Sequence, residues 1–237
     1  MYRSTTSQAV IGLALLILTG PAQAGSFGVS PIRVTLTPPQ PTGMLTVRNQ
    51  SDEDTVVQVQ ANAWSQQDGV DVLEESAELI AVPPLFTLPA GGSQVVRVGL
   101  RRQPLAAGEL TYRLLLREVP PPPADDFMGL QVALNLSLPV FVLPAGGARP
   151  ELQGGLVHQA KGTVGLQLLN AGNAHVQLQQ FELTKPDGSV LDSPALSVYL
   201  LPGQSRSWDL EADALPGRWS LAAKTDAGPV EFELQLE

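Results

Sequence analysis

The thirteen residues from Leu130 to Val142 have the sequence LQVALNLSLPVFV, and every second residue is aliphatic. This alternation predicts a β-strand with one apolar face. A usual strand has about five or six residues, so a core strand alone does not explain the length. Pro139 cannot donate a hydrogen bond to a neighbouring strand, which places part of the run at an edge or a bulge. We therefore interpret the run as an edge open to pairing with another chain, with an ordinary last core strand as the alternative.

The same period of two extends through the rest of the N-terminal half. Short segments such as Val57–Gln60 and Val95–Val98 alternate apolar and polar residues, and turns rich in Gly and Pro separate them. We predict strands at about 27–36, 44–50, 55–65, 78–82, 93–101, 110–118 and 129–143. Seven short strands over this length indicate an immunoglobulin-like sandwich. No segment has a helical stripe, which excludes the parallel βαβ architectures.

A second set of strands follows a short segment rich in Pro and Gly, PAGGARP at residues 144–150. We predict these strands at about 152–158, 163–170, 175–184, 196–200, 205–210, 217–224 and 229–236. The predicted fold class is all-β, with two immunoglobulin-like β-sandwich domains at residues 25–144 and 145–237. A linker this short favours a fixed bend with a cleft, in an L or boomerang shape, over independent domain motion.

Residues 1–24 predict a signal peptide. Arg3 supplies a positive charge, an apolar run extends from Ala9 to Leu18, and Ala22 and Ala24 are small residues suited to a cleavage site. A permanent membrane anchor is the alternative, but the apolar run is too short to cross a bilayer core of about 30 Å as a helix. We expect an exported protein without membrane insertion.

The composition argues against an enzyme. Cysteine is absent, which excludes disulfides, thiolate catalysis and cysteine-ligated metals, and only His158 and His175 could serve a catalytic triad or a histidine metal site. We interpret His175 as a structural or surface residue rather than a ligand. The net charge of −9 argues against nucleic acid as a partner. We expect no catalytic residue, no cofactor and no metal.

Two arginines lie in predicted strands and could act together. Arg33 is in the segment SPIRV, and Arg113 interrupts the apolar strand TYRLLLREVP. A guanidinium can hold a carboxylate with two parallel hydrogen bonds, so the two side chains could form a cationic pocket. A solvent-exposed strand face is the alternative for Arg113.

Several segments, taken in order, resemble the PapD-like family of periplasmic pilus chaperones of chaperone–usher systems. They are FGVSPIRVTL (27–36), PPLFTLPAGGSQVVRV (83–98), TYRLLLREVP (111–120), LQVALNLSLPVF (130–141) and LLNAGNAHVQL (168–178). The resemblance implies a boomerang of two domains that binds pilus subunits in the periplasm by donor-strand complementation and delivers them to an outer-membrane usher. The alternative is an immunoglobulin-like structural pilus or cell-surface module without chaperone activity.

The resemblance also assigns roles to individual residues. The donor positions of the family fall on Leu130, Val132, Leu134 and Leu136, and the residue that anchors the subunit's C-terminal carboxylate on the first strand falls on Arg33. The Lys that usually completes this anchor is replaced by Pro139. The segment endings are similar to the archaic (sigma-type) branch, in which an Arg on the preceding strand is expected to act as the anchor. That Arg corresponds to Arg113.

Two further expectations follow from the same resemblance. Family members bury a charged cluster between their domains, and Glu109 corresponds to one of its members. Leu143 replaces the usual Arg partner, so we expect the cluster to be absent here. The open edge of the donor strand also leaves room for self-association of the free chain.

Overall fold

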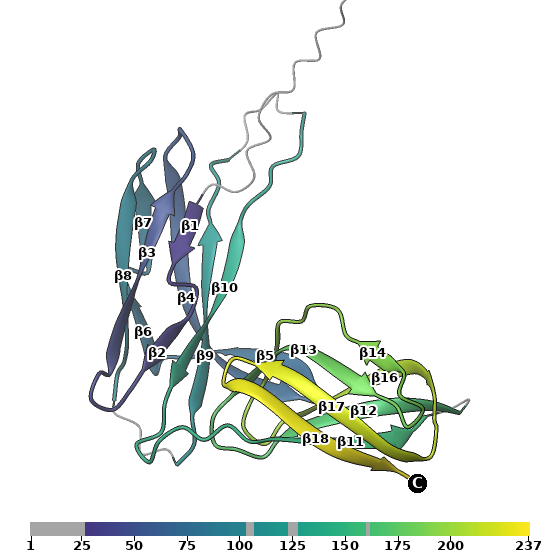
Figure 1. Ribbon diagram of the computed structural model, residues 1–237. Helices are drawn as coiled ribbons and strands as arrows, with labels where there is room; N and C mark the ends of the chain where they lie inside the picture. Colours follow the sequence, from purple (N-terminus) through teal and green to yellow (C-terminus); the bar gives the residue numbers. More distant parts are fainter. Residues whose placement is uncertain (1–26, 103–106, 123–127, 160–161) are drawn as a thin grey trace, which may run out of the picture.

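The computed structural model describes residues 27–102, 107–122, 128–159 and 162–237, so the predicted signal peptide lies outside the described residues. These residues form strands and turns with no α-helix among them, and the strands build two sandwiches arranged as an L (Figure 1). The predicted all-β fold with two immunoglobulin-like sandwiches is confirmed. No described segment forms a helix of the length and apolarity needed to span a membrane.

Within the described residues, the first sandwich contains ten strands in two sheets. They are β1 (Phe27–Ser30), β2 (Val34–Leu36), β3 (Thr42–Asn49), β4 (Thr55–Gln67), β5 (Val70–Glu75), β6 (Leu79–Val82), β7 (Leu85–Leu88), β8 (Ser93–Leu100), β9 (Leu110–Glu118) and β10 (Asn135–Val142). One sheet has the order β1-β3-β8-β6, and the other has the order β2-β10-β9-β4-β5 with β7 also paired to β4. Alternate side chains of both sheets, among them Val47, Leu114 and Val140, are fully buried between them and form the core.

The second sandwich contains the remaining eight strands. They are β11 (Leu152–His158), β12 (Thr163–Asn170), β13 (Val176–Thr184), β14 (Val190–Asp192), β15 (Val198–Leu200), β16 (Ser205–Asp213), β17 (Gly217–Thr225) and β18 (Gly228–Leu236). One sheet has the order β11-β12-β16, and the other has the order β14-β13-β17-β18 with β15 also paired to β13. Leu168, Leu183 and Trp219 are fully buried in its core.

The predicted strand over residues 27–36 is two strands in the structure. β1 pairs with β3 in one sheet, and β2 pairs with β10 in the other, so the chain crosses the sandwich between Ser30 and Val34. Three short strands were not predicted, namely β5, β7 and β14. β5 and β14 have mostly exposed residues, β7 has only four residues, and all three sequences lack the sustained apolar alternation that identifies a half-buried strand.

The predicted strand over residues 129–143 is wrong in its first part, because β10 begins only at Asn135. Its partner β9 ends at Glu118 and is followed by Pro120, so residues before Leu134 have no neighbouring strand to pair with. The alternation is nevertheless maintained inside β10. Leu138, Val140 and Val142 point into the core of the first sandwich.

The two sandwiches are joined by direct contacts as well as by the linker. The hairpin of β4 and β5 reaches the second sandwich (Figure 1), where the Gln66 side chain donates to the carbonyl oxygen of Tyr199 at 2.8 Å and accepts from the amide of Leu201 at 3.0 Å. Trp64 and Phe141 of the first sandwich pack with Leu201 and Tyr199 of the second in a separate buried cluster. These contacts give the bend a fixed geometry.

Candidate functional site

The strand β10 has one paired edge and one edge that is mostly open. Along its whole length it pairs with β9, whereas β2 covers the other edge only from Val140 to Val142. Residues 135–139 therefore have no strand partner on that edge within the described part of the chain. An unpaired edge presents backbone N–H and C=O groups that can pair with another chain.

The position of Pro139 fits this open edge. The carbonyl oxygen of Leu134 accepts a hydrogen bond from Glu118 of β9, and the amide of Leu143 donates to Leu36 of β2. Because successive residues of a strand direct their polar groups to opposite edges, the even-numbered residues face β9 and the odd-numbered ones face β2 and the open edge. Pro139 thus costs no hydrogen bond to β9. Because proline has no backbone N–H, the unpaired N–H donors on the open edge end before Pro139.

The four predicted donor residues differ in their exposure to solvent. Leu130 and Val132 are 87% and 76% exposed, whereas Leu134 and Leu136 are partly buried and pack against the core of the first sandwich. The segment before β10, residues 128–134, runs away from the sheets beside the upper part of the first sandwich (Figure 1). The exposed apolar pair therefore lies on the unpaired continuation of the strand.

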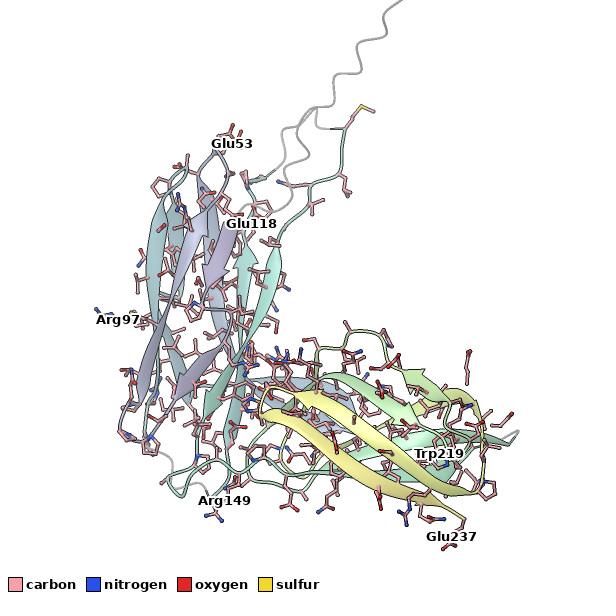
Figure 2. The ribbon with its side chains drawn as sticks, viewed as in Figure 1. Glu53, Arg97, Glu118, Arg149, Trp219 and Glu237 are labelled. Carbon is pink, nitrogen blue, oxygen red and sulfur yellow. The ribbon has the colours of Figure 1, made fainter. Side chains whose placement is uncertain are left out.

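This continuation is held at its base by side chains. The Glu118 carboxylate accepts a hydrogen bond from the amide of Leu134 at 3.0 Å, and the Gln131 side chain donates to the carbonyl oxygen of Pro121 at 3.0 Å. Figure 2 shows Glu118 at the end of the first sandwich where the continuation begins. The segment is thus tied by hydrogen bonds to Glu118 and Pro121 at the end of β9.

Arg113 lies on β9 directly opposite Pro139, at the lower end of the open edge. Its guanidinium carbon is 3.7 Å from the centroid of the Trp64 ring, which is close stacking. Its nearest carboxylate, that of Asp71, is 3.9 Å away, and among the described residues the guanidinium makes no hydrogen bond. The side chain is only 14% exposed. Arg113 is therefore a largely buried cation with unused donors.

The surroundings of Arg113 favour an incoming anion. Burial lowers the pKa of the Arg113 guanidinium, and the charges of Asp71 and Tyr199 oppose this shift. An arginine remains protonated under such conditions, so the cost of burial persists until an anion pairs with it. Two other polar atoms nearby, Oδ1 of Asn62 and Nε1 of Trp64, are buried without a hydrogen-bond partner. Unsatisfied groups of this kind are rare in folded proteins.

Arg33 lies between β1 and β2 and is already engaged by the second sandwich. It donates to Oδ2 of Asp226 at 2.7 Å, to the hydroxyl of Tyr199 at 2.9 Å and to Oε1 of Gln177. Burial lowers the pKa of Arg33, but the hydrogen bonds and charges of Asp226 and Tyr199 raise it overall. Its side chain is 33% exposed, so one part of the guanidinium still faces solvent.

The structure brings the two predicted anchor residues to one place. The guanidinium carbons of Arg33 and Arg113 each lie 5.5 Å from the centroid of the Tyr199 ring. Arg33 also lies 5.8 Å from the centroid of Phe141, the outward-facing residue that follows Val140 on β10. Two cations thus flank one aromatic cluster at the base of the L, where the open edge of β10 ends.

A buried charged cluster lies between the sandwiches, and our expectation that it would be absent is wrong. The fully buried Glu109 carboxylate accepts from the backbone amide of His175 at 2.7 Å and is 2.9 Å from its Nδ1. Nε2 of His175 is 3.5 Å from Oδ2 of Asp226, and its ring stacks on Phe141 with centroids 3.5 Å apart. His175 thus takes the place of the basic partner missing at Leu143.

The sequence indicates a structural role for His175, but it does not indicate that Glu109, His175 and Asp226 come together. His175 follows an Asn-rich turn and was interpreted as structural, which its burial between two carboxylates supports. Asp226 lies in the turn between β17 and β18, where an acidic residue is ordinarily a solvated turn residue. Nothing local to Asp226 indicates that it meets Arg33 and His175, which are far away in the chain.

The pKa values of the cluster follow from these contacts. Burial raises the pKa of Asp226, but hydrogen bonds from His175, from the amide of Gln177 and from Arg33 lower it overall to about 2. Burial lowers the pKa of His175, but its hydrogen bonds with Asp226 and Glu109 and their charges raise it above the ordinary value. The protonated form of His175 is therefore stabilised between two carboxylates.

Comparison with known proteins identifies one family model along the first half of the chain. The model described as pili and flagellar-assembly chaperone, PapD N-terminal domain, matches residues 26–148, which is more than half of the 237 residues. No curated protein sequence matches the chain.

Solved structures share the fold along nearly the whole chain. A chain of the CsuC–CsuE chaperone–tip adhesion subunit pre-assembly complex of the archaic chaperone–usher Csu pili of Acinetobacter baumannii is 20% identical, with a TM-score of 0.69 and coverage of 89% of this chain and 98% of that one. The E. coli chaperone DraB is 21% identical, with a TM-score of 0.62 and coverage of 90% and 97%. A chain of the Salmonella enterica SafA pilin–SafB chaperone complex is 17% identical, with a TM-score of 0.64 and coverage of 89% and 97%. At these identities the similarity shows the fold alone.

Proposed function

Because the chain belongs to the family of pili and flagellar-assembly chaperones, we propose that it binds pilus subunits through the open edge of β10 and lends them this strand. The family assignment decides between the two functions that the sequence left open, in favour of a chaperone over a structural module. A subunit that lacks one strand exposes a groove of unpaired backbone groups and apolar pockets. A donated strand satisfies the backbone groups while its alternate side chains fill the pockets.

The observation that carries this proposal is the exposed apolar pair on the continuation of β10. Leu130 and Val132 lie in solvent, on the same face of an extended segment, beyond an edge that has no strand partner among the described residues. Burying one such side chain contributes about 1.5–3 kcal/mol, so the pair would contribute about 3–6 kcal/mol before entropy costs. Leu134 and Leu136 complete the donor row but are already partly buried.

The subunit's C-terminal carboxylate would dock at the base of the L. We assign the main anchor to Arg113, because its guanidinium has unused donors and a buried position, whereas Arg33 is already held by three acceptors of the second sandwich. The missing basic residue at Pro139 supports this assignment, since Arg113 is its direct neighbour across the β9–β10 ladder. Arg33 would contribute the second cation.

Compartment and partners belong to the same proposal. The predicted signal peptide at residues 1–24 and the family support a location in the periplasm, where an outer-membrane usher would receive the subunits. The similarity to a chain of the archaic Csu complex supports the archaic branch. We keep residues 25–144 and 145–237 as the domain limits, and propose a binding protein without enzymatic activity. The open edge could also pair with a second copy when no subunit is bound.

The test is capture of a subunit. We would co-express the full chain with pilus subunits of the organism that encodes it and isolate the complex from the periplasm. The double variant Leu130→Asp with Val132→Asp should lose at least about tenfold of the captured subunit, since two charges would enter apolar pockets. Both positions are exposed, so the fold should remain intact.

The matched control is Val157→Asp with Val190→Asp, two exposed valines of the second sandwich. This variant should capture as much subunit as the unmodified chain. Equal capture by both double variants would show that the continuation of β10 is not the donated strand.

A further inference from the structure

His175 lies at the centre of the charged cluster at the base of the L, in contact with both carboxylates. Its Nδ1 lies against Glu109, which precedes β9, and its Nε2 faces Asp226 in the turn between β17 and β18. The Tyr199 ring of β15 is 5.7 Å away between centroids, and the remaining face of the imidazole is stacked on Phe141 of β10. The ionisable groups that face it are therefore two carboxylates and a phenol, with Arg33 reached through Asp226.

One oxygen atom links His175 to Arg33, the second cation of the proposed carboxylate site. Oδ2 of Asp226 accepts a hydrogen bond from Nη1 of Arg33 at 2.7 Å and also lies 3.5 Å from Nε2 of His175. The other oxygen, Oδ1, accepts from the backbone amide of Gln177 at 2.8 Å, which fixes the carboxylate in position. Arg33 and His175 therefore share a single acceptor.

The charge of the cluster depends on the proton of His175. With a neutral imidazole, the carboxylates of Glu109 and Asp226 face one cation, Arg33, and the cluster has one excess negative charge. With a protonated imidazole the cluster is balanced. A carboxylate that arrives next to Arg33 is repelled in the first state and not in the second, and partial burial strengthens the difference.

We propose that capture of a subunit's C-terminal carboxylate is coupled to protonation of His175 through the shared oxygen of Asp226. Protonated His175 donates to Asp226 from Nε2 and so compensates its charge. Arg33 can then turn Nη1 from Asp226 to the incoming carboxylate. His175 and Asp226 act as positioning residues for Arg33, and this role rests on the proposed function. The coupling is reciprocal, so a bound subunit favours the protonated form of His175.

The pKa of His175 is raised, so the proposed coupling should appear as a change in capture at alkaline pH. Both carboxylates favour the imidazolium in the free chain, so the proton is lost only when the pH rises above the ordinary histidine range of about 6.5. Capture should therefore be tighter at about pH 6 than at about pH 9.

The experiment measures dissociation of the purified chaperone–subunit complex at these two pH values. The unmodified chain should release the subunit about tenfold faster at the higher pH, in the usual range of coupling between sites. His175→Gln keeps a hydrogen-bond donor toward Glu109 but cannot gain a proton, so its two rates should agree within about twofold. His158→Gln removes the only other histidine and should keep the tenfold difference.

Two outcomes would overturn the coupling: equal rates at both pH values for the unmodified chain, or an unchanged pH dependence in His175→Gln. Failure of the unmodified chain to capture any subunit at either pH would instead contradict the proposed function. If His175→Gln does not fold, NMR titration of His175 in the unmodified chain decides. Its pKa should be higher in the complex than in the free chain, and an equal or lower value would refute the coupling.

Discussion

Arg113 and Arg33 are both cations but differ in burial and in the use of their hydrogen-bond donors. The donors of Arg33 are used by Asp226, Gln177 and Tyr199, so this side chain already stabilises the contact between the sandwiches. Arg113 is more buried and is stacked on Trp64 without a hydrogen bond among the described residues. A buried cation without a close partner gains most from an incoming carboxylate. This difference could not be inferred from the strand pattern. The pattern shows only that both arginine side chains point away from the core of the first sandwich.

We predict that Arg113→Ala weakens subunit capture by at least about thirtyfold, because removing one partner of a desolvated charge pair costs about 2–5 kcal/mol. Arg117→Ala is the matched control, since Arg117 is exposed on the same face of β9, four residues further along. It should change capture by less than about threefold. Comparable losses in both variants, measured as dissociation constants of the complex, would refute the anchor role of Arg113.

Arg33→Ala should behave differently from Arg113→Ala. It removes hydrogen bonds that link the two sandwiches, so the free energy of unfolding of the free chain should fall. The expected loss is roughly 1.5–3 kcal/mol, the contribution of a hydrogen bond to a charged group. Arg113→Ala should leave the unfolding free energy of the free chain within about 1 kcal/mol, because its guanidinium has no close acceptor to lose. Urea titrations of both variants test this, and a larger loss of stability in Arg113→Ala would contradict it.

At the scale of the element, β10 combines a core strand with an unpaired continuation. The alternation of aliphatic residues is continuous from Leu130 to Val142. Pairing with β9 begins only at Asn135, because β9 ends at Glu118, shortly before Pro120. The aliphatic period therefore identifies which residues share a face, and the neighbouring strand decides which of them are buried. This is why two of the four predicted donor residues are free and two already pack against the core.

We predict that the Glu118 carboxylate keeps this continuation aligned. Glu118→Ala removes the acceptor of the Leu134 amide, and a hydrogen bond to a charged group is worth about 1.5–3 kcal/mol. Hydrogen exchange at the Leu134 amide should therefore become about tenfold faster or more. Glu53→Ala is the control, because the exposed Glu53 side chain lies at the same end of the sandwich (Figure 2), whereas the Leu134 amide donates to Glu118. Unchanged exchange at Leu134 in Glu118→Ala would refute the prediction.

At the scale of the whole molecule, the bend is maintained by two buried networks. The Gln66 amide bridges to the backbone of Tyr199 and Leu201, and Glu109, His175, Asp226 and Arg33 form a chain of charges across the same junction. Arg33 and the open edge of β10 both belong to the first sandwich, but the second sandwich supplies the three acceptors that orient the Arg33 side chain. The geometry of the site is therefore a property of both domains.

This junction should make the stability of the chain depend on pH in two windows. The depressed pKa of Asp226 contributes stability that is present above its unfolded value of about 4 and is lost as the pH falls through about 2. The raised pKa of His175 contributes stability that is full below about 6.5 and is lost as the pH rises through its folded value. We expect the highest melting temperature between about pH 4 and pH 6.5, measured by calorimetry. His175→Gln should lose the decline on the alkaline side, and a decline as steep as that of the unmodified chain would exclude this histidine as its cause.

The amino-acid sequence alone predicted most of the strands, the division into two sandwiches and the face shared by the predicted donor residues. These features depend on local alternation and on turn residues, which act over a few positions of the chain. Only the tertiary structure decided that Leu130 and Val132 are free, that Arg33 is engaged while Arg113 is not, and that Glu109, His175 and Asp226 meet. The physical reason is distance along the chain. Side chains from β9, β13 and the β17–β18 turn become neighbours only after both sandwiches have formed and docked, so their charges and pKa values are set by contacts that no local pattern encodes.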